Sequence, residues 1–487
     1  MKKISRRACL RRSIAAAAGA AVAGGVRASV WGRPIGANGD VRLAFFGLQR
    51  RGPQLLEAFR RVGGVRIVGL CDADRAFVDR AAAKCKARGE SVTGCVDFRR
   101  ILDDKNVDAV VIAAPNHWHA LMAVWACQAG KDVYVEKPVS HTIREGRQMI
   151  AAARKHRRIV QAGTQNRSDV GLIEAVAWLK AGNLGKVVLA RGFDLPARAS
   201  IGKVDGPQPI PGTVDYNLFQ GPAPLVPLMR RRLHYDWHFV WPTGDGDCGN
   251  RGVHTFDTIR WFLGDPPLPG RAVSVGGRFG FDDDAATPNT QVTVFTGPPV
   301  PIVWEMLTLP KGRAQRRPGR FGKIRSNMVI EYEGGCFAGS RGGGRALDRD
   351  GKVVKRFQGD SGRTHQANFI RAVRSRKTDQ LRAEIRQGHL STSLCHLANI
   401  SWRIGRRQPA DAIRRAVKDS RHLAEAFARQ LAHLRANHVD LAATPLTLGP
   451  ELTIDKKREC TTGEFRDWAN MYLTRTYRRP FVMPENV

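Results

Sequence analysis

Short apolar runs alternate with segments of helical spacing over residues 41–161. Apolar side chains recur at helical intervals in 53–62 and 74–88, whereas the runs around them are short and mostly apolar, as in buried strands. Strands that alternate with helices build a parallel, doubly wound sheet. The pattern therefore predicts an α/β domain of the Rossmann type, with strands at 41–46, 65–71, 107–113, 132–135 and 158–160.

The remainder of the chain, 162–487, begins with strand-like runs that follow one another without helices between them. Such runs indicate an antiparallel or mixed open sheet, so the second domain is expected to be α+β. Two stretches rich in Gly, Pro and Arg, 308–326 and 339–352, are interpreted as loops. The predicted strands are 186–193, 272–278, 290–295, 301–307 and 327–332.

Helical spacing returns at the C-terminal end. Three helices are predicted from His365 onward, the longest of them over 411–436. Residues 437–487 are expected to be loop-like with a short helix near 462–472, and no role is assigned to them.

Composition is that of a globular protein, and 487 residues allow two to three domains. The charge is unusual, because 79 Lys and Arg against 44 Asp and Glu give +35. A basic protein attracts nucleic acid or acidic polysaccharide. The arginines are scattered, however, and accompany no nucleic-acid motif, so a nucleic-acid partner is not favoured. No apolar run reaches the ~18 residues that a membrane-spanning helix needs.

The first 28 residues resemble a twin-arginine export leader. Arg6 and Arg7 precede a weakly hydrophobic, Ala- and Gly-rich segment at 14–26, and small residues allow cleavage before Ser29. We expect a leader at 1–28, a linker at 29–40, and delivery to the periplasm by the twin-arginine machinery, which carries folded proteins. The nine cysteines include no C-x-x-C pair and are interpreted as buried free thiols.

The turn after the first predicted strand reads Gly47-Leu48-Gln49-Arg50-Arg51-Gly52. It follows the dinucleotide fingerprint G-x-G-x-x-G except that Gln49 replaces the middle glycine, so Gly47, Gln49, Arg51 and Gly52 are candidate pyrophosphate contacts. Gln49 also leaves open a domain that has lost its cofactor, because its side chain could fill the space that pyrophosphate needs.

Asp72 ends the second strand, 25 positions after Gly47, where a carboxylate can bind the adenosine ribose. This carboxylate would repel a 2′-phosphate, so NAD is favoured, while Arg75 keeps NADP possible.

Two further turns carry a family resemblance. Ala114-Pro115-Asn116-His117-Trp118-His119 and Glu136-Lys137-Pro138 resemble the paired turns of the glucose–fructose oxidoreductase / inositol dehydrogenase (Gfo/Idh/MocA) family. Further agreement follows at 161–165, 218–224, 249–257, 365–369 and 394–400.

The resemblance implies a sugar oxidoreductase with a Rossmann domain, a substrate domain and a homo-oligomer formed through the outer face of the second sheet. The further cofactor-binding residues that it implies are Pro115, Asn116, His119, Glu136, Lys137 and Gln165.

Hydride transfer from a sugar carbon needs a group that takes the hydroxyl proton and a donor for the developing alkoxide. Lys137 follows a central strand and, if desolvated, can have a lowered pKa. His254 is the candidate base, although a structural histidine is the alternative. Relatives carry an acid four residues before this histidine, where this chain has Asn250; Asp257, three residues after it, and Asp247 are possible substitutes.

Several other side chains leave alternatives open. His117 is either a site residue or a solvated turn residue, and Trp237, His238 and Trp241 are either sugar-stacking or core residues. His234, Asp236 and His238 would lie on one face if their stretch were a strand, but no second cluster supports a metal, and none is predicted.

The sequence thus predicts an exported NAD(P)-dependent oxidoreductase for a sugar, polyol or glycoside that holds its cofactor tightly. One alternative is a glycosidase that oxidises its substrate transiently and gives net hydrolysis. Another is an inactive sugar-binding relative, and the charge alone suggests a polyanion binder.

Overall fold

The structure is a computed structural model that describes residues 39–297, 299–310, 320–321 and 324–487. The predicted leader and most of the predicted linker lie outside the described residues. None of the helices in the described part of the chain is both long and apolar enough to cross a bilayer.

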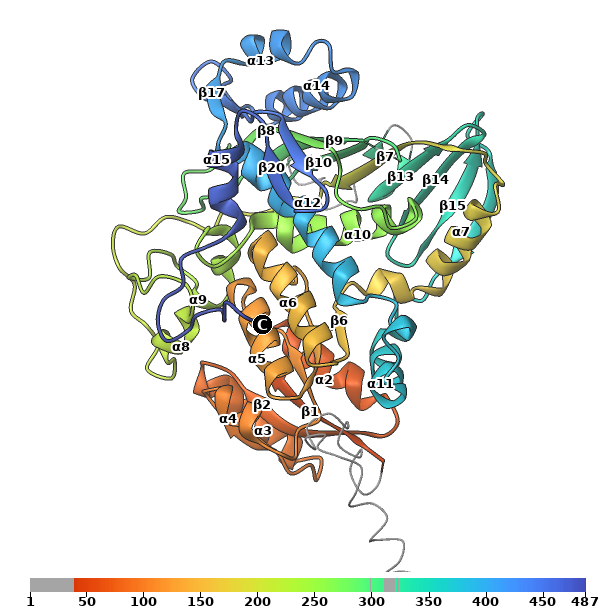
Figure 1. Cartoon of the computed structure of the whole chain (residues 1–487). Coiled ribbons are helices and arrows are strands. Elements are labelled where there is room, and N and C mark those ends of the chain that lie inside the picture. Colours follow the sequence, from red (N-terminus) through yellow and green to blue (C-terminus); the bar gives the residue numbers. More distant parts are fainter. Residues whose placement is uncertain (1–38, 298, 311–319, 322–323) are drawn as a thin grey trace, which may run out of the picture.

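The first domain is a six-stranded parallel sheet in the order β3-β2-β1-β4-β5-β6. Its central strands are buried along their length, and helices cover both faces (Figure 1). The order reverses between β1 and β4, and ligands of such sheets bind outside the carboxyl ends of the strands at this point. The strands are β1 (Val41–Phe46), β2 (Val65–Cys71), β3 (Thr93–Cys95), β4 (Ala109–Ile112), β5 (Asp132–Val135) and β6 (Val160–Ala162).

The helices of this domain are α2 (Arg51–Arg60), α3 (Arg75–Lys86), α4 (Arg99–Asp103), α5 (Asn116–Gln128) and α6 (Ile143–Lys155). The predicted Rossmann architecture is confirmed. The pattern did not predict β3 or the one-and-a-half-turn α4, because three residues containing a glycine give no alternation, and it set no bounds for α5 and α6.

The second domain is built on a twelve-stranded mixed sheet, as predicted, in which β7 and β10 are parallel and the other pairs are antiparallel. Its main strands are β7 (Val187–Asp194), β8 (Arg271–Gly277), β9 (Thr290–Thr296), β10 (Ile302–Leu307), β13 (Met328–Tyr332), β14 (Gly335–Ser340), β15 (Gly343–Asp348) and β16 (Val353–Gln358). The two residue pairs β11 (Arg320–Phe321) and β12 (Ile324–Arg325) form a separate small ladder.

The interpretation of 339–352 as a loop was wrong, because this stretch contains β15 and the end of β14. Its glycines make room for a ring: a Cβ on Gly344 would lie 2.5 Å from the Phe337 ring, and one on Gly339 would also collide with it. Glycine here supports close packing within a strand rather than a turn.

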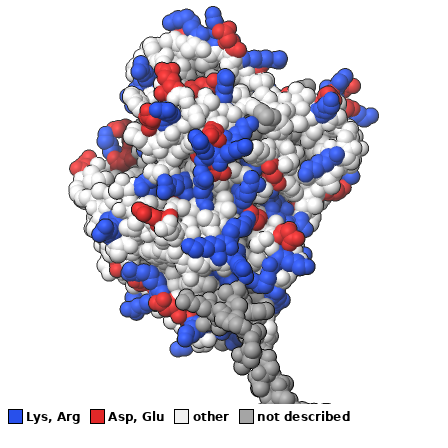
Figure 2. Space-filling view, in the orientation of Figure 1, with Lys and Arg blue, Asp and Glu red and all other residues white. Residues whose placement is uncertain are grey.

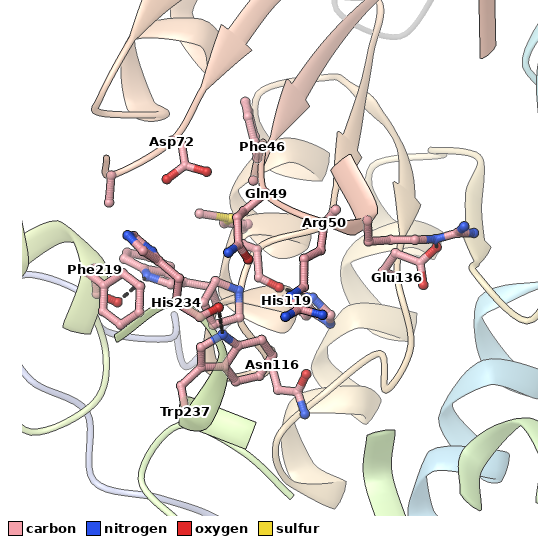
Figure 3. A pocket seen from close by; sticks show the side chains of 18 of the residues that line it. Phe46, Gln49, Arg50, Asp72, Asn116, His119, Glu136, Phe219, His234 and Trp237 are labelled. Carbon is pink, nitrogen blue, oxygen red and sulfur yellow. Dashed lines mark hydrogen bonds and ion pairs between the residues drawn. The ribbon is translucent and has the colours of Figure 1, made fainter. Parts of the chain in front are cut away.

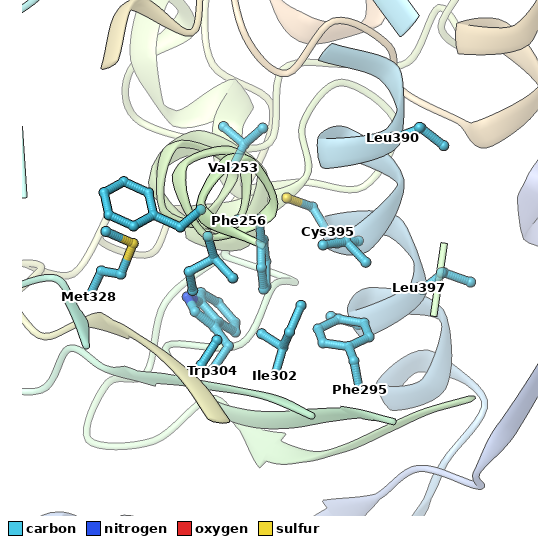
Figure 4. Close-up of a cluster of buried hydrophobic side chains, with 14 of the residues drawn as sticks. Val253, Phe256, Phe295, Ile302, Trp304, Met328, Leu390, Cys395 and Leu397 are labelled. Atoms are coloured by element: carbon cyan, nitrogen blue, oxygen red, sulfur yellow. The ribbon is translucent and has the colours of Figure 1, made fainter. Parts of the chain in front are cut away.

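Helices cover both faces of the second sheet. On the face toward the first domain lie α7 (Val170–Lys180), α10 (Val253–Phe262) and α12 (Ile385–Arg403). Figure 4 shows Val253 and Phe256 of α10 and Leu397 of α12 above the sheet residues Phe295 and Trp304.

The other face of β8–β10 is covered by α13 (Ala410–Ala416) and α14 (Arg421–Ala436). The prediction of one helix over 411–436 was wrong, and the longest helix is α12 instead. Val417 and Leu423 both pack on the sheet, yet their separation of six residues does not fit a helical repeat. The helix is interrupted before Ser420, and this interruption lets both side chains face the sheet.

The last 50 residues contain more structure than predicted. Besides the expected short helix, α15 (Arg466–Asn470), they include β18 (Leu446–Leu448), β19 (Leu452–Asp455) and β20 (Cys460–Thr462); β17 (Arg406–Gln408) completes the sheet edge. Residues 474–487, here called the C-terminal strap, then return to the first domain beside α5 (Figure 1). There the Phe481 ring packs edge-on against Trp118, with 5.2 Å between ring centroids.

The charged surface is mixed. Figure 2 shows Lys and Arg spread over the visible face and interspersed with Asp and Glu. The eight described cysteines are free thiols, six of them buried; Cys336 and Cys460 are partly exposed.

Candidate active site

A cavity of about 250 Å³ lies at the carboxyl ends of β1, β2, β4 and β5. Asp72 and Ala73 line one end, and Lys137 and Asn250 line the other. In Figure 3, Asp72 and Glu136 mark opposite sides, and Gln49 and Arg50 reach into the space between them.

The turn after β1 has the backbone that the fingerprint requires. Gly47 has φ +88°, and a Cβ there would lie 2.5 Å from the carbonyl carbon of Ala113. A Cβ on Gly52 would overlap the carbonyl oxygen of Gly47. Both positions therefore need glycine, as close helix–strand packing demands.

The residues between these glycines face the cavity. Gln49 lines it, and the Arg50 guanidinium lies 4.1 Å from the centroid of the Tyr235 ring. Arg50 has φ +48°, a left-handed backbone that is uncommon for a non-glycine residue.

Asp72 connects the turns after β1 and β2. Its carboxylate accepts hydrogen bonds from the backbone N–H of Leu48 at 2.7 Å and of Asp74 at 3.0 Å. Burial raises the pKa of Asp72 to about 6, although both N–H donors favour the charged form. Val96 and Phe98 provide an apolar wall at this end, whereas Arg75 is not among the lining residues.

The Glu-Lys-Pro turn after β5 holds its two charged side chains in buried pairs. Arg51 Nε donates to Glu136 Oε1 at 2.7 Å, and this pair with nearby Lys137 holds the pKa of Glu136 below its usual range despite burial. Lys137 Nζ donates to the carbonyl oxygen of Asn250 at 2.6 Å and lies 3.2 Å from its Oδ1. Burial lowers the pKa of Lys137.

The first turn of α5 is fixed by buried polar contacts, and Pro115, Asn116 and His119 line the cavity. Asn116 Nδ2 donates to Asp245 Oδ2 at 2.9 Å. The His119 ring lies between the carbonyl oxygens of Ala114 and Pro138, at 2.7 and 2.6 Å, so it connects this turn to the Glu-Lys-Pro turn.

His117 is not a solvated turn residue, because its ring is buried between the carbonyl oxygens of Phe219 and Thr243, at 3.0 and 3.3 Å.

His254 begins α10 beside Lys137 but outside the lining of the cavity. Its Nδ1 is buried and has no hydrogen-bond partner among the described residues. Burial, followed by the positive charges of Lys137 and Arg51, holds the pKa of His254 well below its usual value. The ring is therefore neutral at pH 7, and its Nδ1 is open to a hydrogen bond from a ligand.

Asp257 does not line the cavity and is bound by other side chains instead. Its carboxylate accepts from Arg167 Nε at 2.9 Å and from Ser391 Oγ at 2.8 Å, and it is fully buried. Arg167 also pairs with Asp265 at 2.7 Å. The geometry thus places Asp257 in an ion pair that joins α10 to neighbouring segments, away from the position that a substitute for the missing acid would need.

Gln165 is also outside the lining of this cavity; it borders a separate hollow together with Arg51 and Arg341.

A polar cluster beside Lys137 was not predicted apart from Asp247 and His238. Asp247 accepts from Arg198 Nε at 2.9 Å and from Arg251 at 3.3 Å, and Arg198 also donates to the Tyr235 hydroxyl at 2.9 Å. His238 lines the cavity, and burial lowers its pKa to about 3. No motif signals the cluster, because Arg198 lies 37 residues before Tyr235 and 49 residues before Asp247.

Residues 213–238, here called the cap, cover the Asp72 end. Their backbone bonds to that of the turn after β2, from Arg75 N–H to Thr213 and from Asp215 N–H to Ala73, both at 2.8 Å. His234 Nε2 lies 2.9 Å from Asp74 Oδ2. The stretch around His234 is helical, as α9 (Leu233–Asp236) and a 3-10 turn, rather than a strand. No group of three or more His, Cys, Asp or Glu side chains in the described part of the chain could hold a metal ion.

Two family models match this architecture. The oxidoreductase family model for the NAD-binding Rossmann fold of Gfo/Idh/MocA proteins matches residues 41–164, and its C-terminal alpha/beta domain model matches 185–294. The matched regions, 41–164 and 185–294, belong to the Gfo/Idh/MocA oxidoreductase family. Gly47, Gly52 and the partly buried Asp72 carboxylate provide the turn and the acid with which this fold binds NAD.

Curated relatives are similar in sequence to part of this chain. Inositol 2-dehydrogenase 1 of Saccharopolyspora erythraea is 36% identical over 139 residues, which are 28% of this chain and 40% of that protein. Alpha-N-acetylgalactosaminidase of Shewanella oneidensis is 36% identical over 120 residues, 24% of this chain and 26% of that protein. The chain therefore spans less than half the length of these curated relatives.

Among solved structures, the WlbA dehydrogenase of Bordetella pertussis, in complex with NADH and UDP-GlcNAcA, has the same fold. It superposes with a TM-score of 0.55 at 18% identity, covering 74% of this chain and 95% of that chain.

Proposed function

We propose that this protein is an NAD-dependent oxidoreductase acting on a hydroxyl group of a sugar, polyol or glycoside. The observation that carries this proposal is one continuous cavity, which joins the Asp72 carboxylate to the partly buried Lys137 ammonium. Bound NAD would supply the nicotinamide that exchanges a hydride with the substrate carbon.

The residues beside Lys137 support a division of labour. Lys137, held by Asn250, is placed to hydrogen-bond the reacting oxygen, and desolvation strengthens this contact. Neutral His254 lies beside Lys137, just outside the cavity lining, and its Nδ1, which has no partner among the described residues, is the proposed acceptor of the hydroxyl proton. His238 and Trp237 also line this end, and their rings stack at 3.6 Å between centroids, which gives a sugar a flat surface.

We propose further that the cofactor stays bound through the catalytic cycle. The cap closes the Asp72 end with backbone hydrogen bonds, and opening it means breaking them. A retained cofactor suits a protein that is exported folded, so the leader-like residues 1–28 favour twin-arginine export and a periplasmic location.

A second candidate is a glycosidase that oxidises and then reduces its substrate, with net hydrolysis. The likeness to the alpha-N-acetylgalactosaminidase favours it, and it requires a retained cofactor. Any homo-oligomer formed through the second sheet would have to use β13–β16, because α14 covers β8–β10.

One experiment tests whether the protein carries NAD, which both enzymatic proposals require. The full-length precursor is expressed, the folded protein is purified without added nucleotide and denatured, and the released nucleotide is identified by mass. Stoichiometric NAD is expected, and NADP would overturn the role given to Asp72. Protein that carries no nucleotide and binds no added NAD would overturn both enzymatic proposals and support an inactive sugar-binding relative.

Glycoside cleavage without net NADH formation by the loaded enzyme would select the glycosidase. Net NADH formation from a free sugar or polyol would select the dehydrogenase.

A further inference from the structure

A second cavity, of about 290 Å³, lies beyond Asp245 from the cofactor cavity. Asp245 faces it, while its Oδ2 holds Asn116 of the first cavity at 2.9 Å. The walls come from the start of α6, the segment before α10, the C-terminal half of α12, and the strap with the residues just before it. The polar lining residues used below are His141, Asp245, His396, Asn399, Arg403 and Arg475.

Asp245 remains a carboxylate in this wall. Its Oδ1 lies 3.0 Å from His141 Nδ1 and 3.7 Å from His396 Nδ1. Burial would raise its pKa, but His141, His396 and Asn116 together hold the pKa of Asp245 at about 2. This carboxylate can therefore accept hydrogen bonds from a ligand at neutral pH.

Two other lining side chains have polar atoms without hydrogen-bond partners in the described part of the chain. Asn399 Nδ2 donates to the backbone carbonyl of Asp245 at 3.0 Å, which orients its Oδ1 as a buried acceptor that no described residue serves. Arg475 is 10% exposed, and its buried Nη1 finds no hydrogen-bond acceptor among the described residues, with the ion-pair partner Glu145 Oε1 3.9 Å away. Buried polar groups are normally satisfied, so an unmatched acceptor and an unmatched cationic donor in one cavity indicate a ligand that supplies their partners.

A third side chain adds a second cation. The Arg403 guanidinium lies between two rings, 4.5 Å from the centroid of Trp241 and 4.0 Å from that of Tyr472. Stacking fixes the plane of a guanidinium while leaving its N–H edge able to bind an anion. Two arginines and one carboxylate thus line the cavity, and Glu145, the ion-pair partner of Arg475 at 3.9 Å, lies behind the lining.

We propose that this cavity binds a small hydroxycarboxylate of the sugar-acid type. Its carboxylate pairs with Arg475 and Arg403, and its hydroxyl groups donate to Asn399 Oδ1 and Asp245. The site is separate from the redox cavity and needs no chemical step.

Calorimetric titration of the purified holoprotein tests the proposal, with D-gluconate as the probe. Acetate supplies the carboxylate without the hydroxyls, glucose the hydroxyls without the carboxylate, and inorganic phosphate a different anion. Gluconate is expected to bind at least about tenfold more tightly than each of the three. No saturable gluconate binding, or equal binding of phosphate or acetate, would overturn the proposal.

Substitutions locate the site. Arg475→Gln and Arg403→Gln are each expected to weaken gluconate binding at least about tenfold, whereas Arg458→Gln, at a side chain 82% exposed outside the cavity, leaves it unchanged. Unfolding temperature and nucleotide content show whether each variant is folded, and the two arginine variants serve as alternatives if one is not. Lys137→Met, which alters only the redox cavity, is expected to bind gluconate as the wild type does; a loss there would assign gluconate to the redox cavity instead.

Discussion

The two ends of the cofactor cavity are built in different ways. At the Asp72 end, one carboxylate accepts hydrogen bonds from two backbone N–H groups. Both donors, Leu48 and Asp74, lie within 24 residues of Asp72 in the sequence. At the Lys137 end, one ammonium is held by Asn250, 113 residues away, beside a cluster that joins Arg198 to residues of the segment 235–251. The first arrangement depends on backbone geometry that a fold preserves. The second depends on side chains that can change, which makes it the place where substrate choice is determined.

The largest effect is expected at the Lys137 end. Lys137→Met removes the cation beside the reacting oxygen, so kcat/KM should fall about 100-fold or more while bound NAD is retained. Kinetics on the loaded enzyme and nucleotide mass measure the two quantities. Lys155→Met, on the exposed face of α6, is the control. Equal loss of NAD and activity would remove the functional distinction between the two ends.

At the Asp72 end, Asp72→Asn should weaken NAD binding about tenfold and leave the chemistry of retained cofactor intact. Ribose hydroxyls donate to a carboxylate, and the pKa of Asp72 is raised to about 6, so wild-type affinity should weaken as pH falls through 6. Asp72→Asn should lose this pH dependence. Titration of cofactor-stripped protein between pH 5 and 8 checks it, and a wild-type profile in the variant would contradict the assignment.

The stability of the cofactor-free protein should depend on pH in the opposite direction to its affinity for NAD. Since the folded-state pKa lies above the ordinary Asp value, proton uptake stabilises the cofactor-free fold below about pH 6, and this stabilisation is lost as pH rises through 6.

A smaller effect is expected from Asn250→Asp, which introduces an acid where Lys137 Nζ now meets an amide oxygen at 3.2 Å. The new charge should raise the pKa of Lys137 and move the pH optimum of kcat upward, with a change of a few-fold at pH 7. Asn183→Asp on an exposed turn is the matched control. An unchanged pH profile would show that Lys137 does not titrate in the rate-limiting step.

The smallest change in activity is expected from Asp257→Asn. Its partner Arg167 is 3% exposed, so breaking this buried pair should cost about 3 kcal/mol of folding free energy. Activity per folded molecule should change less than that of Asn250→Asp. Chemical denaturation and active-site titration separate the two quantities, and a loss of kcat without a loss of stability would return Asp257 to the chemistry.

The sequence predicts those features that depend on residues close together in the chain. The β-α periodicity, the glycine turn and the Glu-Lys-Pro turn each lie within a few residues, and the structure brings them to one sheet edge. Asp257 was chosen because it shares a helix face with His254, but its other neighbour, Arg167, comes from 90 residues earlier. Likewise, the glycines around Phe337 predict a loop from the sequence alone. In the structure they are strand residues, and the Phe337 ring occupies the space that their side chains would need. Helical and strand periodicity cannot supply such distant partners.

The C-terminal strap bears on the order in which the cofactor cavity forms. Phe481 packs on Trp118, which itself lines the cavity, so a side chain far along the chain supports a wall of the first domain. Since domains fold as they emerge during synthesis, the sheet of the first domain can form before residues 474–487 are made. The contact of Phe481 with Trp118 can form only afterwards, so this wall gains its support later than the sheet beneath it.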